Sequence, residues 1–168
     1  MIFPIFSHTA KKEIRSKKTM ENECKRKKCE EALAEIYRNT DLAMQSIENI
    51  LPQVEHEGMK QELHAQHDGY EQIAAKAAKI AKDKGIALKE PGPFKKAMMW
   101  GSIKMSSMMD GSRNHIAEMM VRGTVMGITA LRTTQTDLPI EPDKEIEGLL
   151  VELIELEEGY EKKLKEYL

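Results

Sequence analysis

Apolar and polar residues along this chain repeat with the period of an α-helix. Apolar side chains recur three or four positions apart over long stretches, which is the spacing of one face of a helix. Pro52 ends the first stretch, Gly85 ends the second, and Ser112 is placed to cap the fourth. The pattern predicts helices over residues 21–51, 55–84, 94–110, 113–136 and 143–167.

Short connections between long amphipathic helices favour antiparallel neighbours. The composition agrees, because 32% of the residues are charged, only 5% are aromatic and 12 are Met, a mixture typical of helices. A chain of 168 residues suits one domain with a sizeable core. We therefore expect an all-α protein, an antiparallel up-down four-helix bundle with one interrupted helix and five helical segments in all.

A basic segment precedes the helical pattern. Residues 1–29 hold nine Lys or Arg against three Glu, but no binding fold accompanies them, so we expect a solvated tail and no nucleic-acid partner. We expect residues 1–19 to be a disordered extension, or a misassigned start with translation beginning at Met20. Residues 20–168 should form a single helical domain. No stretch approaches the roughly 20 apolar residues of a membrane span, so we expect a cytoplasmic protein.

Polar residues interrupt the apolar faces near the middle of the predicted helices. Thr40 and Gln66 lie equally far from the first turn and should share one level. Glu118 and Glu157 lie almost equally far from the last loop and should share another. A carboxylate inside a protein must be paired, hydrogen-bonded, metal-bound or protonated, because a bare buried charge is costly. These acids are the one arrangement in the sequence suited to chemistry.

The helix predicted over residues 113–136 carries further candidate groups. His115 and Glu118 share a face as i, i+3 neighbours. They form either a solvent-facing stripe, a buried polar network or a pair of metal ligands. Gly123 and Gly127 stand four residues apart on the opposite face, where small residues let another helix approach closely.

The segments "SRNHIAEMMVRGTVMGI" and "LIELEEGYEKKLKEYL" carry a family resemblance. With the helical pattern, they make roughly residues 30–168 resemble the ferritin-like superfamily of four-helix bundles. The chain looks most like small bacterial families of that type whose function is not established. This resemblance implies long helical hairpins that bury polar groups at mid-height.

Di-iron members of that superfamily place a Glu on each of two helices and Glu-x-x-His on each of two others. Glu118 and Glu157 match this pattern only as inward acids, and the order of His115 and Glu118 is reversed. The second helix offers Gln66-His67, and the last helix contains no His. The resemblance therefore does not imply a complete di-iron centre.

Two classes of function remain open. The first, which we favour, is a non-catalytic protein with a structural or interaction role and no cofactor. Its Met-rich segment 98–126 would mediate homo-oligomerisation or bind a protein partner. The second is a metal-binding protein with a degenerate carboxylate and His site that holds a single iron or other transition metal. Its candidate ligands are Glu118, Glu157, His115 and His67.

Overall fold

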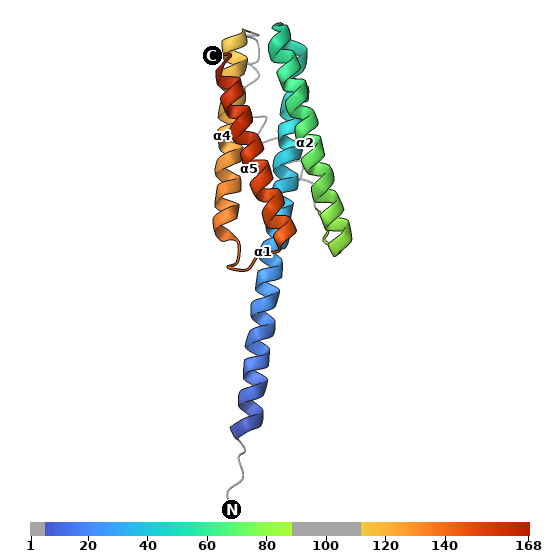
Figure 1. Cartoon of the computed structure of the whole chain (residues 1–168), viewed down its shortest axis with the longest axis vertical. Coiled ribbons are helices and arrows are strands. Elements are labelled where there is room, and N and C mark those ends of the chain that lie inside the picture. Colours follow the sequence, from blue (N-terminus) through green and yellow to red (C-terminus); the bar gives the residue numbers. More distant parts are fainter. Residues whose placement is uncertain (1–5, 89–111) are drawn as a thin grey trace, which may run out of the picture.

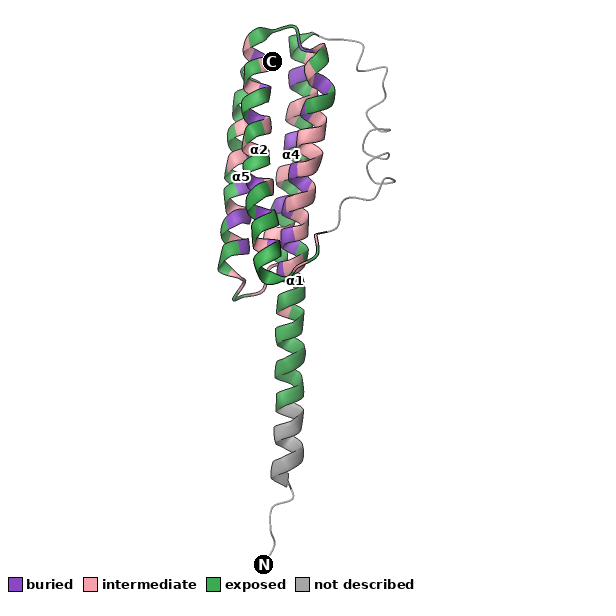
Figure 2. Ribbon diagram, turned by 90° about the vertical axis from the view of Figure 1, so that its right-hand side faces the viewer, coloured by how far each residue is buried: buried purple, intermediate pink, exposed green. Residues whose placement is uncertain are grey.

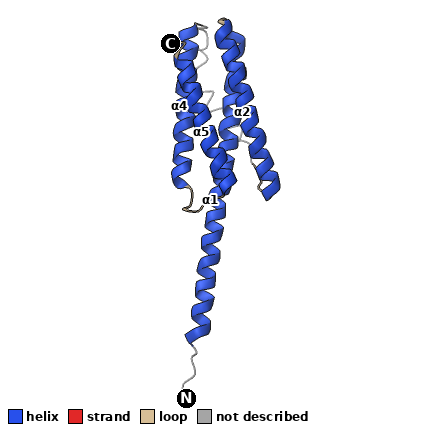
Figure 3. Ribbon diagram, viewed as in Figure 1, coloured by secondary structure: helices blue, strands red, loops and turns tan. Residues whose placement is uncertain are grey.

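The computed structural model describes residues 6–88 and 112–168, with side chains from residue 15 onward. Within these ranges the chain forms helices and no strand, which confirms the all-α prediction (Figure 3). The predicted helix 94–110 lies outside the described residues. The elements in Figure 1 are α1 (Phe6–Ile50), the 3-10 turn η1 (Leu51–Gln53), α2 (Glu57–Lys84), α4 (Arg113–Asp137) and α5 (Lys144–Lys165).

Local chemistry fixes the ends of these helices close to their predicted positions. Pro52 lies in η1, directly after α1. Gly85 ends α2 with a φ of 66°, a left-handed conformation that glycine adopts without steric cost. Ser112 caps α4 through its hydroxyl, as predicted. Asp143 caps α5 by accepting hydrogen bonds from two backbone N–H groups at 3.1 and 3.3 Å.

The first helix begins at Phe6, well before the predicted start at residue 21. Its N-terminal part projects beyond the other helices (Figure 1), and the side chains of residues 15–24 are exposed (Figure 2). The prediction began where apolar side chains start to repeat, but straight charged side chains favour a helix without any burial. The helix thus includes most of the segment expected to be disordered, while the start of translation at Met20 stays a prediction.

The directions of the helices differ from a simple up-down order. Figure 1 shows α1 and α5 running one way and α2 and α4 running the other. Both α1 and α5 pack against α2 and α4, so these neighbouring pairs are antiparallel. The end of α2 and the start of α4 consequently lie at opposite ends of the helices.

A continuous apolar core lies between the four helices. The apolar side chains that recur three or four positions apart along α1, α2 and α5 all contribute to this core, which confirms the helical periodicity of the sequence. Burial of this size supplies most of the stabilisation of such helices. The largest fully buried side chains are Leu33, Ile36, Ile47, Met59, Leu63, Ile73, Ile116, Leu131, Ile146, Leu150, Leu153 and Ile154.

The apolar circumference of α4 is only partly covered. Ile116 and Leu131 are buried, whereas Val125 is 42% exposed and Met126 is 70% exposed. The sequence placed all four among the apolar residues of this helix. Met126 lines the groove described next, whereas Val125 lies on the side of α4 that faces Glu158 and Glu161 of α5.

Candidate functional site

Glu157 is the most deeply buried ionisable acid in the described part of the chain. Its side chain is 1% exposed, because position 157 falls on the apolar stripe of α5 between Leu153 and Leu164. One carboxylate oxygen, Oε1, accepts a hydrogen bond of 3.3 Å from the hydroxyl of Tyr70. The other oxygen, Oε2, is buried and has no hydrogen-bond partner in the described part of the chain. The sequence predicted an inward Glu157 with a partner, and the structure identifies Tyr70 on α2 as that partner.

Tyr70 is itself held by an aromatic neighbour. It is buried and meets Tyr160 edge-on, with ring centroids 5.4 Å apart and an interplanar angle of 64°. Burial, followed by the nearby Glu157 and Tyr160, raises the pKa of Tyr70 well above its usual value. The phenol therefore remains protonated at neutral pH and donates to the carboxyl group.

The environment of Glu157 favours its neutral form. Burial raises the pKa of this carboxyl from 4.5 to about 8, and the hydrogen bond from Tyr70 lowers it only in part. At pH 7 most molecules therefore carry a protonated Glu157. No Lys, Arg or His among the described residues forms an ion pair with it.

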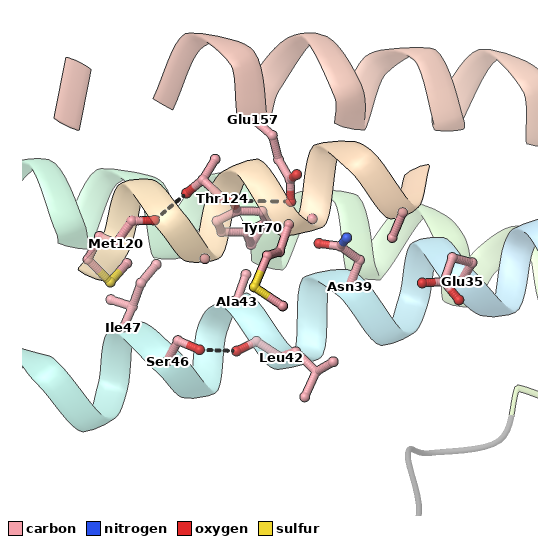
Figure 4. Close-up of a pocket in the computed structure, with 14 residues that line it drawn as sticks. Glu35, Asn39, Leu42, Ala43, Ser46, Ile47, Tyr70, Met120, Thr124 and Glu157 are labelled. Carbon is pink, nitrogen blue, oxygen red and sulfur yellow. Dashed lines mark hydrogen bonds between the residues drawn. The ribbon is translucent and has the colours of Figure 1, made fainter. Parts of the chain in front are cut away.

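A groove between α1 and α4 leads to this carboxyl group. It encloses about 250 Å³ and is bordered mainly by apolar and small residues. Figure 4 shows Glu157 pointing from α5 toward Tyr70 and toward the side chains of α1 that line the groove. Asn39, which is 9% exposed, lies beside the acid on α1. The apolar and small lining residues are Leu42, Ala43, Ile47, Met120, Gly123, Met126, Gly127 and Ala130.

A glycine makes room for the acid at the end of the groove. A Cβ atom on Gly127 would lie 2.7 Å from Oε2 of Glu157 and 3.1 Å from Nδ2 of Asn39. Real Cβ atoms do not approach an oxygen that closely, so a larger residue here would displace the carboxyl group. The sequence predicted a close approach of another helix at both glycines. At Gly127 the nearest atoms are the ends of two side chains, those of Glu157 and Asn39, and not a helix backbone. At Gly123 the prediction is wrong, because a Cβ there would have no neighbour within 4 Å among the described residues, and Gly123 lines the open groove.

The lining of the groove carries acids without basic groups. Glu35 and Glu157 are its two carboxyl residues, and none of the described lining residues is Lys, Arg or His. Glu35 already forms an ion pair with Arg38 along α1. Glu157 is therefore the acid of the groove that lacks a cationic partner.

The four metal-ligand candidates from the sequence do not converge. Glu118 is exposed and forms an ion pair with Arg122, the pairing expected for a solvent-facing stripe. His115 lies half-buried in the first turn of α4. Glu157 lies beside Gly127, nine residues along α4 from Glu118, which corresponds to about 14 Å at the helical rise.

The predicted common level of Glu118 and Glu157 is therefore wrong. The prediction counted residues 138–143 as if they continued along a helix axis. These residues form the turn between α4 and α5 and add little axial rise, so Glu157 meets α4 nearer its C-terminal end.

His67 lies in a different neighbourhood. Its Nε2 is 3.2 Å from a carboxylate oxygen of Glu48. It also shares with Asp68 and Glu71 a group in which potential ligand atoms lie within 4.8 Å of one another. No such group among the described residues contains Glu118, Glu157 or His115. Exposed acidic groups of this kind are common on protein surfaces and do not by themselves indicate a metal.

The two polar residues expected in the core are buried and locally satisfied. Thr40 is fully buried, and its hydroxyl donates to backbone carbonyl oxygens one turn earlier in α1. Gln66 is 1% exposed, and its Nε2 donates to Glu62 at 3.0 Å. Asn39 was missed by the sequence reasoning, although it precedes Thr40 and shares the inward side of α1.

Comparisons with family models, curated proteins and solved structures gave no match to this chain. In the described ranges, 6–88 and 112–168, none of the helices has the length and apolar character that crossing a membrane requires. The site described above thus provides the basis for a functional proposal.

Proposed function

We propose that the chain is a ferritin-like four-helix bundle. Support comes from the directions of its helices, because α1 and α2 form one antiparallel pair, α4 and α5 form another, and α2 and α4 run in the same direction. Ferritin-like bundles have one long crossover connection between two such pairs. An experimental structure of residues 20–168 with all helices in a simple up-down order would contradict this assignment.

We further propose that the protein is non-catalytic and acts by binding a small molecule in the groove between α1 and α4. The observation that carries this proposal is the unpartnered Oε2 of Glu157 at the end of a mainly apolar groove. Pockets for small molecules are typically apolar with a few well-placed polar groups that orient the ligand. Glu157 and Asn39 supply such groups here.

Two methyl-bearing residues and two glycines allow a direct test of groove binding. NMR would follow the methyl groups of Ala43 and Ile47 while fragments with neutral, cationic and anionic head groups are added. Saturable shifts are expected for at least one class of fragment. Gly123→Phe should abolish them by filling the groove, since its Cβ has no neighbour within 4 Å. The matched control is Gly159→Phe, an equally open and exposed glycine of α5 outside the groove.

The absence of saturable shifts for every class of fragment would refute groove binding. Equal loss of binding in the Gly159→Phe control would also refute it, because the effect would then arise from general loss of structure. Urea unfolding of both variants measures that loss independently.

A metal centre receives less support than groove binding. Glu157 is the one buried acid among the four candidates, and the others lie elsewhere on the helices. A carboxylate-bridged metal pair needs about six ligands. We therefore propose that the protein retains less than about one iron per chain after anaerobic reconstitution with ferrous iron. Two tightly bound irons per chain, lost together in Glu118→Ala, would contradict this.

The exposed part of α4 favours a second interaction. Val125 and Met126 are exposed apolar residues at the end of the Met-rich segment 98–126, of which residues 112–126 are described. We propose that they contribute to self-association or to binding a protein partner. Analytical ultracentrifugation should show weaker association for Met126→Lys than for wild type. Identical sedimentation at matched concentrations would contradict a role in self-association.

A further inference from the structure

We infer that the groove binds a small amphipathic cation, with an ammonium group donating a hydrogen bond to Oε2 of Glu157 and an apolar body lying between α1 and α4. This inference rests on the proposed groove-binding function and assigns its ligand class. The hydrogen bond from Tyr70 occupies Oε1, which leaves Oε2 as the acceptor that faces the groove.

The charges around the groove select the sign of the ligand. Among the described residues, its ionisable lining groups are the carboxyls of Glu35 and Glu157 and the phenol of Tyr70, without any Lys, Arg or His. Glu35 is already neutralised by Arg38, whereas Glu157 has no ion pair. A buried carboxyl ionises readily only beside a cation, and a ligand cation would supply the partner that the described residues do not provide.

The geometry around the acid suits an ammonium group. An ammonium has three N–H donors and no acceptor, so it needs several oxygens at the closed end of a site. Oε2 of Glu157 offers one such oxygen, and Asn39 lies beside it on α1 with its amide nitrogen, Nδ2, nearest to Gly127. Gly127 keeps this end open, because any Cβ there would collide with Oε2.

The size and walls of the groove define the rest of the ligand. Its volume of about 250 Å³ exceeds the roughly 150 Å³ of a cavity that accommodates benzene. The space therefore suits an aromatic ring with a short alkyl chain. Side chains such as Leu42, Ile47 and Met120 provide apolar contacts for that body.

Binding a cation should release a proton. In the empty protein at neutral pH, Glu157 carries its proton, since burial raises its pKa to about 8. The ligand arrives as an ammonium ion, the carboxyl proton passes to the buffer, and an ammonium–carboxylate pair remains. Among the described residues, Tyr70 from α2 binds this carboxyl, and Asn39 and Glu35 line the same groove from α1; Tyr160 of α5 contacts the ring of Tyr70, and α4 contributes no titratable lining residue. The affinity should therefore increase with pH up to about 8.

The test compares three probes that share one apolar body. These are 2-phenylethylamine, the neutral 2-phenylethanol and the anionic phenylacetate, measured by isothermal titration calorimetry on the full chain. The amine should bind at least about tenfold more tightly than the alcohol, as expected for a charge-assisted hydrogen bond. Its affinity should increase roughly twentyfold from pH 6 to pH 7.5 through deprotonation of one carboxyl group. Titrations in two buffers of different ionisation enthalpy should report release of about one proton.

Two variants locate the effect. Glu157→Gln keeps the shape of the side chain and should remove the preference for the amine together with its pH dependence. The matched control is Glu118→Gln, which alters an exposed acid of α4 and should leave both unchanged. The pH dependence of the wild-type protein provides a readout that does not depend on the folding of any variant.

The outcomes separate this inference from the function on which it rests. If the alcohol binds as tightly as the amine and Gly123→Phe blocks both, the groove function stands and the cation inference fails. If phenylacetate binds best, the assigned charge is wrong. If none of the probes binds and the fragment titrations also fail, both proposals fail.

Discussion

The pH dependence of stability provides a direct test of the environment assigned to Glu157. The perturbation is Glu157→Gln, which retains the size of the side chain and removes its ionisation. In the folded protein the pKa of Glu157 is raised from 4.5 to about 8, while the unfolded chain exposes the carboxyl to water. Between these two values the folded state holds one more proton than the unfolded state. The free energy of unfolding should therefore decrease as the pH increases through this window.

The magnitude follows from the two pKa values. A shift of one pKa unit corresponds to about 1.4 kcal/mol. Applying the linkage relation between pH 5 and pH 7.5 gives a loss of about 3 kcal/mol from this one group. Other groups titrate in both proteins, so their contributions cancel when wild type and Glu157→Gln are compared at each pH.

Urea unfolding at pH 5, 6.5 and 7.5 measures this difference. Wild type should be stabilised relative to the variant at pH 5 and should lose about 3 kcal/mol of that advantage by pH 7.5. A difference between the two proteins that stays constant across the range would refute the reasoning. It would mean that Glu157 ionises in the folded protein as it does in water.

Three further predictions concern close packing, helix capping and the extension of α1. Gly127→Ala should destabilise the protein, because its Cβ would lie 2.7 Å from a buried carboxylate oxygen. Gly159→Ala, at an open position of α5, should instead stabilise the protein by up to about 1 kcal/mol. Thermal melts in which Gly127→Ala is the more stable of the two variants would contradict the packing. Asp143→Ala should cost about 0.5–2 kcal/mol in urea unfolding through loss of the cap of α5, and an unchanged midpoint would rule out that capping role. Deleting residues 1–19 should leave the melting temperature nearly unchanged, because the described side chains there are exposed; a large decrease would show that the segment packs on the other helices.

The positions of the helix ends could be predicted because local chemistry decides them. Pro52 lacks the backbone N–H that a continuing helix needs, and Gly85 adopts a left-handed conformation at little cost. Ser112 accepts a backbone hydrogen bond that the first turn of α4 would otherwise leave unmade. The N-terminal end of α1 escaped prediction, because helix propensity there acts without an apolar face to mark it.

The buried position of Glu157 could also be predicted, because helical periodicity places it on the apolar stripe of α5 whatever surrounds that helix. The neighbours of Glu157 could not be predicted in the same way. Counting residues through the turn between α4 and α5 placed Glu118 at the height of Glu157. The turn adds little axial rise, however, and the residue of α4 beside Glu157 in the structure is Gly127. Similarly, the pairing with Tyr70 depends on how α2 and α5 lie against each other. The periodicity of apolar residues follows from the sequence of a single helix. The height of a side chain relative to neighbouring helices, and the partner it contacts, depend on how the helices pack, which only the tertiary structure decides.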